Sequence, residues 1–169
     1  ARNVTPGIAA SPSWLYWRSP NEILFTENVD GQAGVATIDL AGGKISPQWT
    51  GSDVISADAQ GEPTISLSGN RRISALIRNS AARPPEIWAG AIGDWKQITH
   101  INDNVHSTWG QLKSLHWSNG DMKVQGWLMY PTDYDASKRY PMVVVVHGGP
   151  AGVAPVSYTH LTLPTILRV

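Results

Sequence analysis

The chain has 169 residues, and its 13 Lys and Arg residues balance 13 Asp and Glu residues, so the formal net charge is zero. This balance argues against a basic face for nucleic acid, the lack of cysteine excludes disulfides and thiolate metal sites, and no apolar run approaches the roughly 20 residues of a membrane-spanning helix. Eight Trp against one Phe, placed among short apolar runs and Gly/Pro turns, favour repeated β-sheet units over a helical bundle.

The first part of the chain alternates short apolar runs with turn signals. Asp30-Gly31 and Ala41-Gly42-Gly43-Lys44 are typical of tight turns between strands, because glycine tolerates the backbone angles that such turns need. We therefore expect an ordered segment at residues 13–17, a turn at 19–22, strands at 23–26 and 35–38, and a further strand around Ile45 and Trp49.

The same order of turns and strands returns further along the chain. We expect a turn at 66–70, a strand at 73–77, a loop at 83–85, a strand at 86–89, a turn at 93–94 and a strand at 95–99. Laid over each other, the two units repeat at roughly 50 residues, which is within the range of β-propeller blades. The alternative is a pair of unrelated hairpins in a β-sandwich.

A third group of elements begins after this repeat. Lys113 to Trp117 predicts a strand, the turn Ser118-Asn119-Gly120-Asp121 closes a hairpin, and Met122 to Tyr130 predicts its second strand. After a polar loop comes Met142 to Val146, an apolar run with four β-branched residues and no polar alternation. Such a run predicts a strand covered on both faces, as in a parallel α/β sheet. It ends abruptly at His147-Gly148-Gly149-Pro150.

The stretch from Leu112 to Pro150 resembles the start of the catalytic domain in the prolyl oligopeptidase family of serine peptidases, above all in its dipeptidyl-peptidase and acylaminoacyl-peptidase branches. The resemblance depends on three blocks in a fixed order, Gly126-Trp127-Leu128-Met129-Tyr130-Pro131, Lys138-Arg139-Tyr140-Pro141 and the final His-Gly-Gly-Pro. It implies a mainly β chain, with the C-terminal blades of a β-propeller in residues 1–112 and the first strands of an α/β-hydrolase domain in residues 113–155.

The resemblance also implies a site. In α/β-hydrolases a loop of the His-Gly-Gly type supplies one N–H of the oxyanion hole. By this likeness the backbone N–H of Gly149 donates to the tetrahedral intermediate, Gly148 permits the required backbone, and His147 supports the loop. The nucleophile of this fold lies in Gly-x-Ser-x-Gly, a pattern that the chain lacks, and the acid and base follow it. We therefore expect this chain to be catalytically inactive.

The end of the chain has a different character. Val156 to Thr165 matches the translated read-through of a common sequencing-library adapter, so we expect residues 156–169 to be derived from an adapter and the natural protein to continue past Ala154. His160 is accordingly no candidate base. Each remaining histidine (His100, His106 and His116) lacks an acidic companion at metal-ligand spacing, so we expect no metal site; no single glutamate (Glu22, Glu27, Glu62 or Glu86) is assigned a role.

The leading hypothesis is a fragment of a serine peptidase that hydrolyses short peptides through an acyl-enzyme, without a cofactor, and with no nucleic-acid or membrane partner. One alternative is a β-propeller that binds ligands without catalysis. The other is an esterase or acyltransferase with the same hydrolase domain. The compartment, the oligomeric state and the substrate preference are not predicted.

Overall fold

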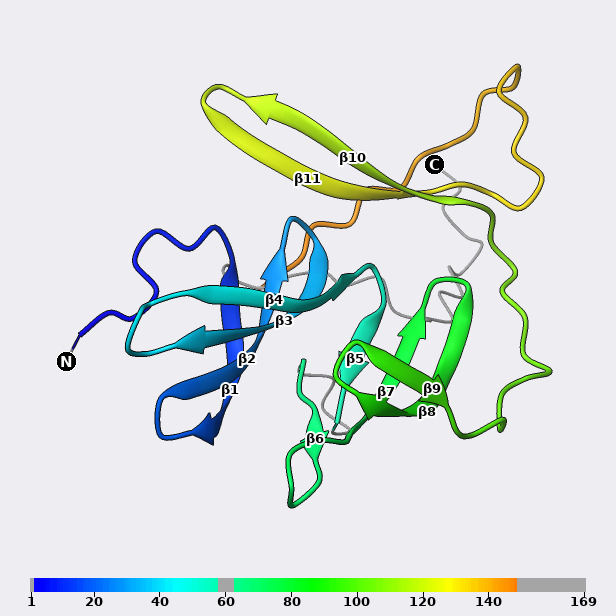
Figure 1. Cartoon of the computed structure of the whole chain (residues 1–169). Coiled ribbons are helices and arrows are strands. Elements are labelled where there is room, and N and C mark those ends of the chain that lie inside the picture. Colours follow the sequence, from blue (N-terminus) through cyan, green and yellow to red (C-terminus); the bar gives the residue numbers. More distant parts are fainter. Residues whose placement is uncertain (1, 58–62, 149–169) are drawn as a thin grey trace.

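The computed structural model describes residues 2–57 and 63–148, and these residues form eleven β-strands and no helix (Figure 1). The described part therefore contains no helix that is long and apolar enough to cross a membrane. The strands form two larger antiparallel sheets and one hairpin. The expectation of a mainly β chain is confirmed.

The first sheet is a four-stranded antiparallel meander in the order β1-β2-β3-β4. Its second and third strands are joined by the Asp30-Gly31 turn, where both residues have positive φ angles of 50° and 75°. This pair of left-handed residues defines the tight hairpin turn that the sequence predicts. The strands are β1 (Ser11–Ser19), β2 (Glu22–Val29), β3 (Gln32–Asp39) and β4 (Ile45–Gly51).

The second sheet repeats this meander, with one change in its first strand. Two short segments, β5 and β6, both pair with successive parts of β7, and β8 and β9 follow in order. The two sheets thus show the repeated unit that the sequence predicts over residues 23–99. The strands are β5 (Val54–Ser56), β6 (Ser66–Leu67), β7 (Ser74–Ser80), β8 (Arg83–Ala91) and β9 (Asp94–Gln97).

The main hydrophobic core lies between the two sheets. Leu24 and Val35 of the first sheet and Ile55, Leu76 and Trp95 of the second belong to one buried cluster. Each of these side chains exposes at most 4% of its surface. Burying a side chain of this size contributes about 1.5–3 kcal/mol, so this contact helps to hold the two sheets together.

The first sheet is also covered on its opposite face. Phe25, Ala36 and Ile38 form a second buried cluster there, against which Val4 and Ile8 of the N-terminal segment pack. Strand β2 is consequently buried on both faces from Leu24 to Glu27. Burial raises the pKa of the Glu27 carboxyl.

The third group of strands is the hairpin of β10 (Leu112–Asn119) and β11 (Met122–Met129), which lies beside the β2–β3 turn. The Nε2 atom of His116 lies 2.8 Å and 2.9 Å from the two carboxylate oxygens of Asp30. Gly31 is so close to the hairpin that an added Cβ would lie 2.4 Å from the Gln125 side chain. The turn of the first sheet therefore serves as the docking point for the hairpin.

The prediction of a strand at Met142 to Val146 is wrong for the described structure. These residues have no regular secondary structure, and their exposed fractions range from 66% to 84%. A strand needs a neighbour for its backbone N–H and C=O groups, and the described residues supply none to this run.

Two shorter predictions also need correction. Arg83-Pro84-Pro85, expected to be a loop, is the beginning of β8, whereas the connecting turn lies at Ala81 and Ala82. The prolines are tolerated because β9 pairs only with the far end of β8, from Trp88 to Ala91. In addition, Ser66 and Leu67, expected to belong to a turn, pair with β7 as strand β6.

The exposed valine run predicts strong binding of a hydrophobic dye. We expect the purified chain to enhance the fluorescence of such a dye, and the Val144→Lys variant to reduce it clearly, because a charge interrupts the apolar surface. Asn104→Lys adds the same charge at another exposed position and serves as the matched control. Equal dye binding by the two variants would show that the valine run is not the surface that binds the dye.

Candidate functional site

The sequence-predicted site residues lie directly after the valine run. His147 and Gly148 are both exposed, and the Nδ1 atom of His147 lies 3.2 Å from the carbonyl oxygen of Gly148. A Cβ added at Gly148 would meet no atom within 4 Å. Gly149 lies outside the described residues. Within the described part, no hydrogen bond joins His147 or Gly148 to another element.

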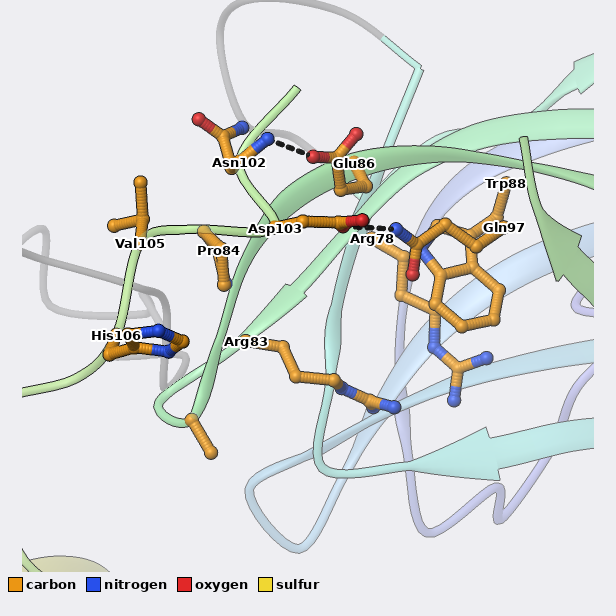
Figure 2. Close-up of a pocket in the computed structure, with 11 residues that line it drawn as sticks. Arg78, Arg83, Pro84, Glu86, Trp88, Gln97, Asn102, Asp103, Val105 and His106 are labelled. Atoms are coloured by element: carbon orange, nitrogen blue, oxygen red, sulfur yellow. Dashed lines mark hydrogen bonds between the residues drawn. The ribbon is translucent and has the colours of Figure 1, made fainter. Parts of the chain in front are cut away.

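A pocket of about 210 Å³ lies instead on the second sheet, between β8 and the segment that follows β9 (Figure 2). No Ser, Thr or Cys is among the residues that line it. The lining residues are Arg78, Ala82, Arg83, Pro84, Glu86, Trp88, Gln97, Asn102, Asp103, Val105 and His106.

One wall of the pocket is built on a buried carboxylate. Oxygen Oδ2 of Asp53 accepts hydrogen bonds from Arg78 Nε at 2.5 Å and from Arg83 Nη2 at 2.6 Å. The Asp53 side chain is only 8% exposed. The guanidinium carbon of Arg78 lies 4.8 Å from the ring centre of Trp88 and 5.5 Å from that of Trp49. Ion pairing and cation–π contacts therefore hold Arg78 in one position.

The opposite wall is held by Glu86 on β8. Its Oε1 accepts a hydrogen bond of 2.5 Å from the backbone N–H of Asn102, and its Oε2 accepts one from the hydroxyl of Thr99. The hydrogen bond from Thr99 is the largest cause that lowers the pKa of the Glu86 carboxyl, followed by the backbone hydrogen bonds from Asn102 and Ile101. Asn102 also donates through Nδ2 to the carbonyl oxygen of Pro85, at 2.7 Å. These bonds fix the segment after β9 against β8.

Two histidines have acidic partners that the sequence analysis missed. His100 Nδ1 lies 3.0 Å from Asp103 Oδ2, and His116 pairs with Asp30 across 86 residues of sequence. His106 lines the pocket. Among the described residues, no group of three or more His, Cys, Asp or Glu residues could hold a metal ion.

The pocket itself was not predicted from the sequence. Glu86 and Trp88 are separated by two positions on β8 and so share a face of the strand. This alternation was the signal in the sequence that could have indicated the pocket. The residues that contact this face of β8 come from the turn before β5 and from the segment after β9, and they could not be assigned from spacing alone.

The described residues form a mainly β fold with one pocket on the second sheet described above, and comparison with known proteins shows what the chain is similar to. No protein-family model matches the chain. A probable dipeptidyl-peptidase 5 of Aspergillus niger is 56% identical over 149 residues, which cover 83% of this chain and 19% of the relative. The dipeptidyl-peptidase 5 of Porphyromonas endodontalis is 26% identical over 107 residues, or 60% of this chain and 15% of the relative.

A solved structure has a similar fold. The acylaminoacyl peptidase of Pyrococcus horikoshii matches with a TM-score of 0.67 and 18% identity, over 94% of this chain and 23% of that protein. The chain therefore spans less than a fifth of the length of the two curated relatives and about a quarter of this structure. Together the matches confirm the resemblance to a portion of a serine peptidase of the prolyl oligopeptidase family.

The hydrogen bonds to Glu86 predict a pH-dependent contribution to stability. Because the pKa of Glu86 is lowered in the folded chain, its carboxylate stabilises the fold above the usual glutamate pKa of about 4.3, and this contribution is lost as the pH falls through the lowered value. We expect Glu86→Gln to lower the urea midpoint at pH 7 and to have much less effect near pH 3.

The control for this measurement is Asp94→Asn, which removes an exposed ion pair with Lys96 and should change the midpoint little. An equal loss of stability in Glu86→Gln at both pH values would contradict the assigned role of the carboxylate.

Proposed function

We propose that the chain is part of a serine peptidase that hydrolyses short peptides through an acyl-enzyme. The observation that carries this proposal is the order of units along the chain. Two successive antiparallel meanders pack face to face, and a hairpin and the His-Gly-Gly run follow them. The 56% identity with a probable dipeptidyl-peptidase 5 supports the same assignment.

In this proposal the two sheets are neighbouring blades of a β-propeller, within residues 1–112. The hairpin and the valine run begin an α/β-hydrolase domain, within residues 113–155, and residues 156–169 derive from an adapter. The exposure of the valine run supports this division, because a central strand of a parallel sheet is covered on both faces only when its neighbouring strands and helices are present.

The chemistry assigned to the loop is electrostatic. The backbone N–H of Gly149 stabilises the oxyanion of the tetrahedral intermediate, and removal of one such donor costs about 3 kcal/mol of transition-state stabilisation. His147 and Gly148 support the conformation of this loop. The nucleophile, the base and the orienting acid are supplied by sequence beyond residue 155. In this proposal the chain by itself cannot form the acyl-enzyme, because it lacks the Gly-x-Ser-x-Gly pattern that carries the nucleophile in this fold.

The first test compares two proteins with a fluorophosphonate probe. We expect no labelling of the 169-residue chain, and labelling of the protein encoded by the gene when it is recovered across the Ala154 junction. The recovered sequence should contain Gly-x-Ser-x-Gly within about 100 residues. Labelling of the 169-residue chain, or a recovered gene without Gly-x-Ser-x-Gly, would contradict the proposal.

The second test concerns the role of Gly149 in the recovered enzyme. Gly149→Pro deletes the donated N–H and should lower kcat by about 100-fold or more, whereas Gly149→Ala keeps the N–H and should retain much more activity. Hydrolysis of dipeptidyl-nitroanilides gives the measurement. If Gly149→Pro folds and keeps full activity, the oxyanion role is wrong.

A further inference from the structure

We propose that the outer edge of strand β1 binds an extended peptide as an additional strand of the first sheet. This inference rests on the proposed function, because it names a surface that would hold the peptides which the enzyme takes. β1 forms one edge of the first sheet, and among the described residues it pairs with β2 alone (Figure 1). The surface is made by residues other than those of the His147–Gly149 loop and of the pocket on the second sheet.

The backbone of β1 presents unpaired groups along this edge. The N–H of Trp14 points at β2, because it donates to the hydroxyl oxygen of Thr26 at 3.2 Å. The pairing with β2 runs without a register shift from Trp14 to Trp17, so successive N–H groups alternate between the two sides of the strand. The N–H and C=O groups of Leu15 and Trp17 therefore point away from β2, and no backbone hydrogen bond joins them to another described element. These are the groups with which an added strand pairs.

The usable part of this edge is residues 13–17, which we call the β1 edge. Pro12 precedes it, has no N–H, and lies at a register shift. At the other end the register shifts again, and the carbonyl oxygen of Arg18 accepts a hydrogen bond from the guanidinium group of Arg71. Five residues of strand span about 17 Å, so the β1 edge has the length of a short peptide.

The β1 edge lacks the features that protect the other edges of the two larger sheets. β4 contains Pro47, β9 has four residues that include an ion pair between Asp94 and Lys96, and β5 and β6 are three and two residues long. Prolines, charged side chains and short length all hinder the addition of a strand. Residues 13–17 contain neither a charged residue nor a proline. Among the described edges of these two sheets, the β1 edge is therefore the one open to another strand.

The side chains of the β1 edge favour apolar residues in the added strand. Leu15 and Trp17 lie on one face of the sheet and are 62% and 51% exposed. Trp14 and Tyr16 lie on the other face, with stacked rings whose centres are 6.0 Å apart. Neighbouring strands are stabilised by aromatic and β-branched side chains that lie side by side on one face. The ligand class is therefore an extended peptide with apolar or β-branched residues.

A peptide fits this edge better than a second copy of the chain does. Self-association through the β1 edge would pair about five residues of each copy, whereas a stable protein interface uses about 20–30 residues on each side. A substrate needs only a transient complex, since Michaelis constants are commonly about 1 μM to 1 mM. A short ladder of backbone hydrogen bonds is sufficient for an affinity of that order.

The experiment is an NMR titration of the 169-residue chain with acetyl-Val-Thr-Val-Thr-Val-amide, in which amide hydrogen exchange of the chain is measured. When the peptide occupies about 90% of the chain, the N–H groups of Leu15 and Trp17 should exchange about tenfold more slowly, because only the free tenth of the molecules exchanges. The N–H groups of β4 should not change. The same peptide with an N-methyl group on every residue lacks the main-chain donors and should not bind.

Two variants at one position separate the backbone from the side chain. Leu15→Pro removes an N–H that points away from β2, a place where edge strands tolerate proline, and should weaken peptide binding at least about tenfold. Leu15→Ala keeps this N–H and should bind within about fivefold of the unchanged chain, the loss of one contact between neighbouring strands. Circular dichroism shows whether each variant is folded. If Leu15→Pro does not fold, the exchange data and the N-methylated peptide decide the question.

Four results would overturn the inference: no binding of the peptide, equal binding of the N-methylated peptide, protection outside residues 13–17 alone, or full binding by folded Leu15→Pro. A chain that dimerises without peptide and then protects residues 13–17 would assign the β1 edge to a second copy and would overturn it as well. Because none of these measurements needs catalysis, their outcome is independent of whether the recovered gene encodes a serine nucleophile.

Discussion

The buried contact between the two sheets is the constraint on which the rest of the structure depends. Leu24 and Val35 face Ile55, Leu76 and Trp95 across one continuous core, and the indole N–H of Trp95 donates to the hydroxyl of Ser74 at 2.7 Å. This hydrogen bond satisfies a polar atom that would otherwise be buried without a partner. The core fixes the distance between the sheets and so determines where their edges meet.

The pocket is a consequence of this packing. Trp49 comes from the last strand of the first sheet, yet its ring lies 5.4 Å from that of Trp95 and 5.5 Å from the guanidinium carbon of Arg78, both in the second sheet. The backbone at Gly93 passes so close that a Cβ there would lie 2.9 Å from the carbonyl oxygen of Gln48. The edge of one sheet therefore helps to position the charged wall of the pocket on the other.

Local signals in the sequence predicted the repeated strands, the Asp30-Gly31 turn and the β10–β11 hairpin, because each depends on residues that are close in the chain. The prediction of a strand at Met142 to Val146 was wrong because a strand also needs hydrogen-bond partners that are distant in sequence. The prediction of a loop at Arg83 was wrong because the effect of a proline depends on which strand lies beside it. The catalytic loop was proposed from resemblance alone, and the pocket was missed because its walls meet only after the sheets pack.

Strand β2 has a further consequence for how the sequence can vary. An ordinary strand with one wet face accepts polar replacements at every second position, so about half of its residues can drift. From Leu24 to Glu27 both faces of β2 are covered, and the hydroxyl of Thr26 donates to the carbonyl oxygen of Pro63. Each of these four positions makes buried contacts, so we expect this stretch to diverge more slowly between homologues than described strands that keep an exposed face.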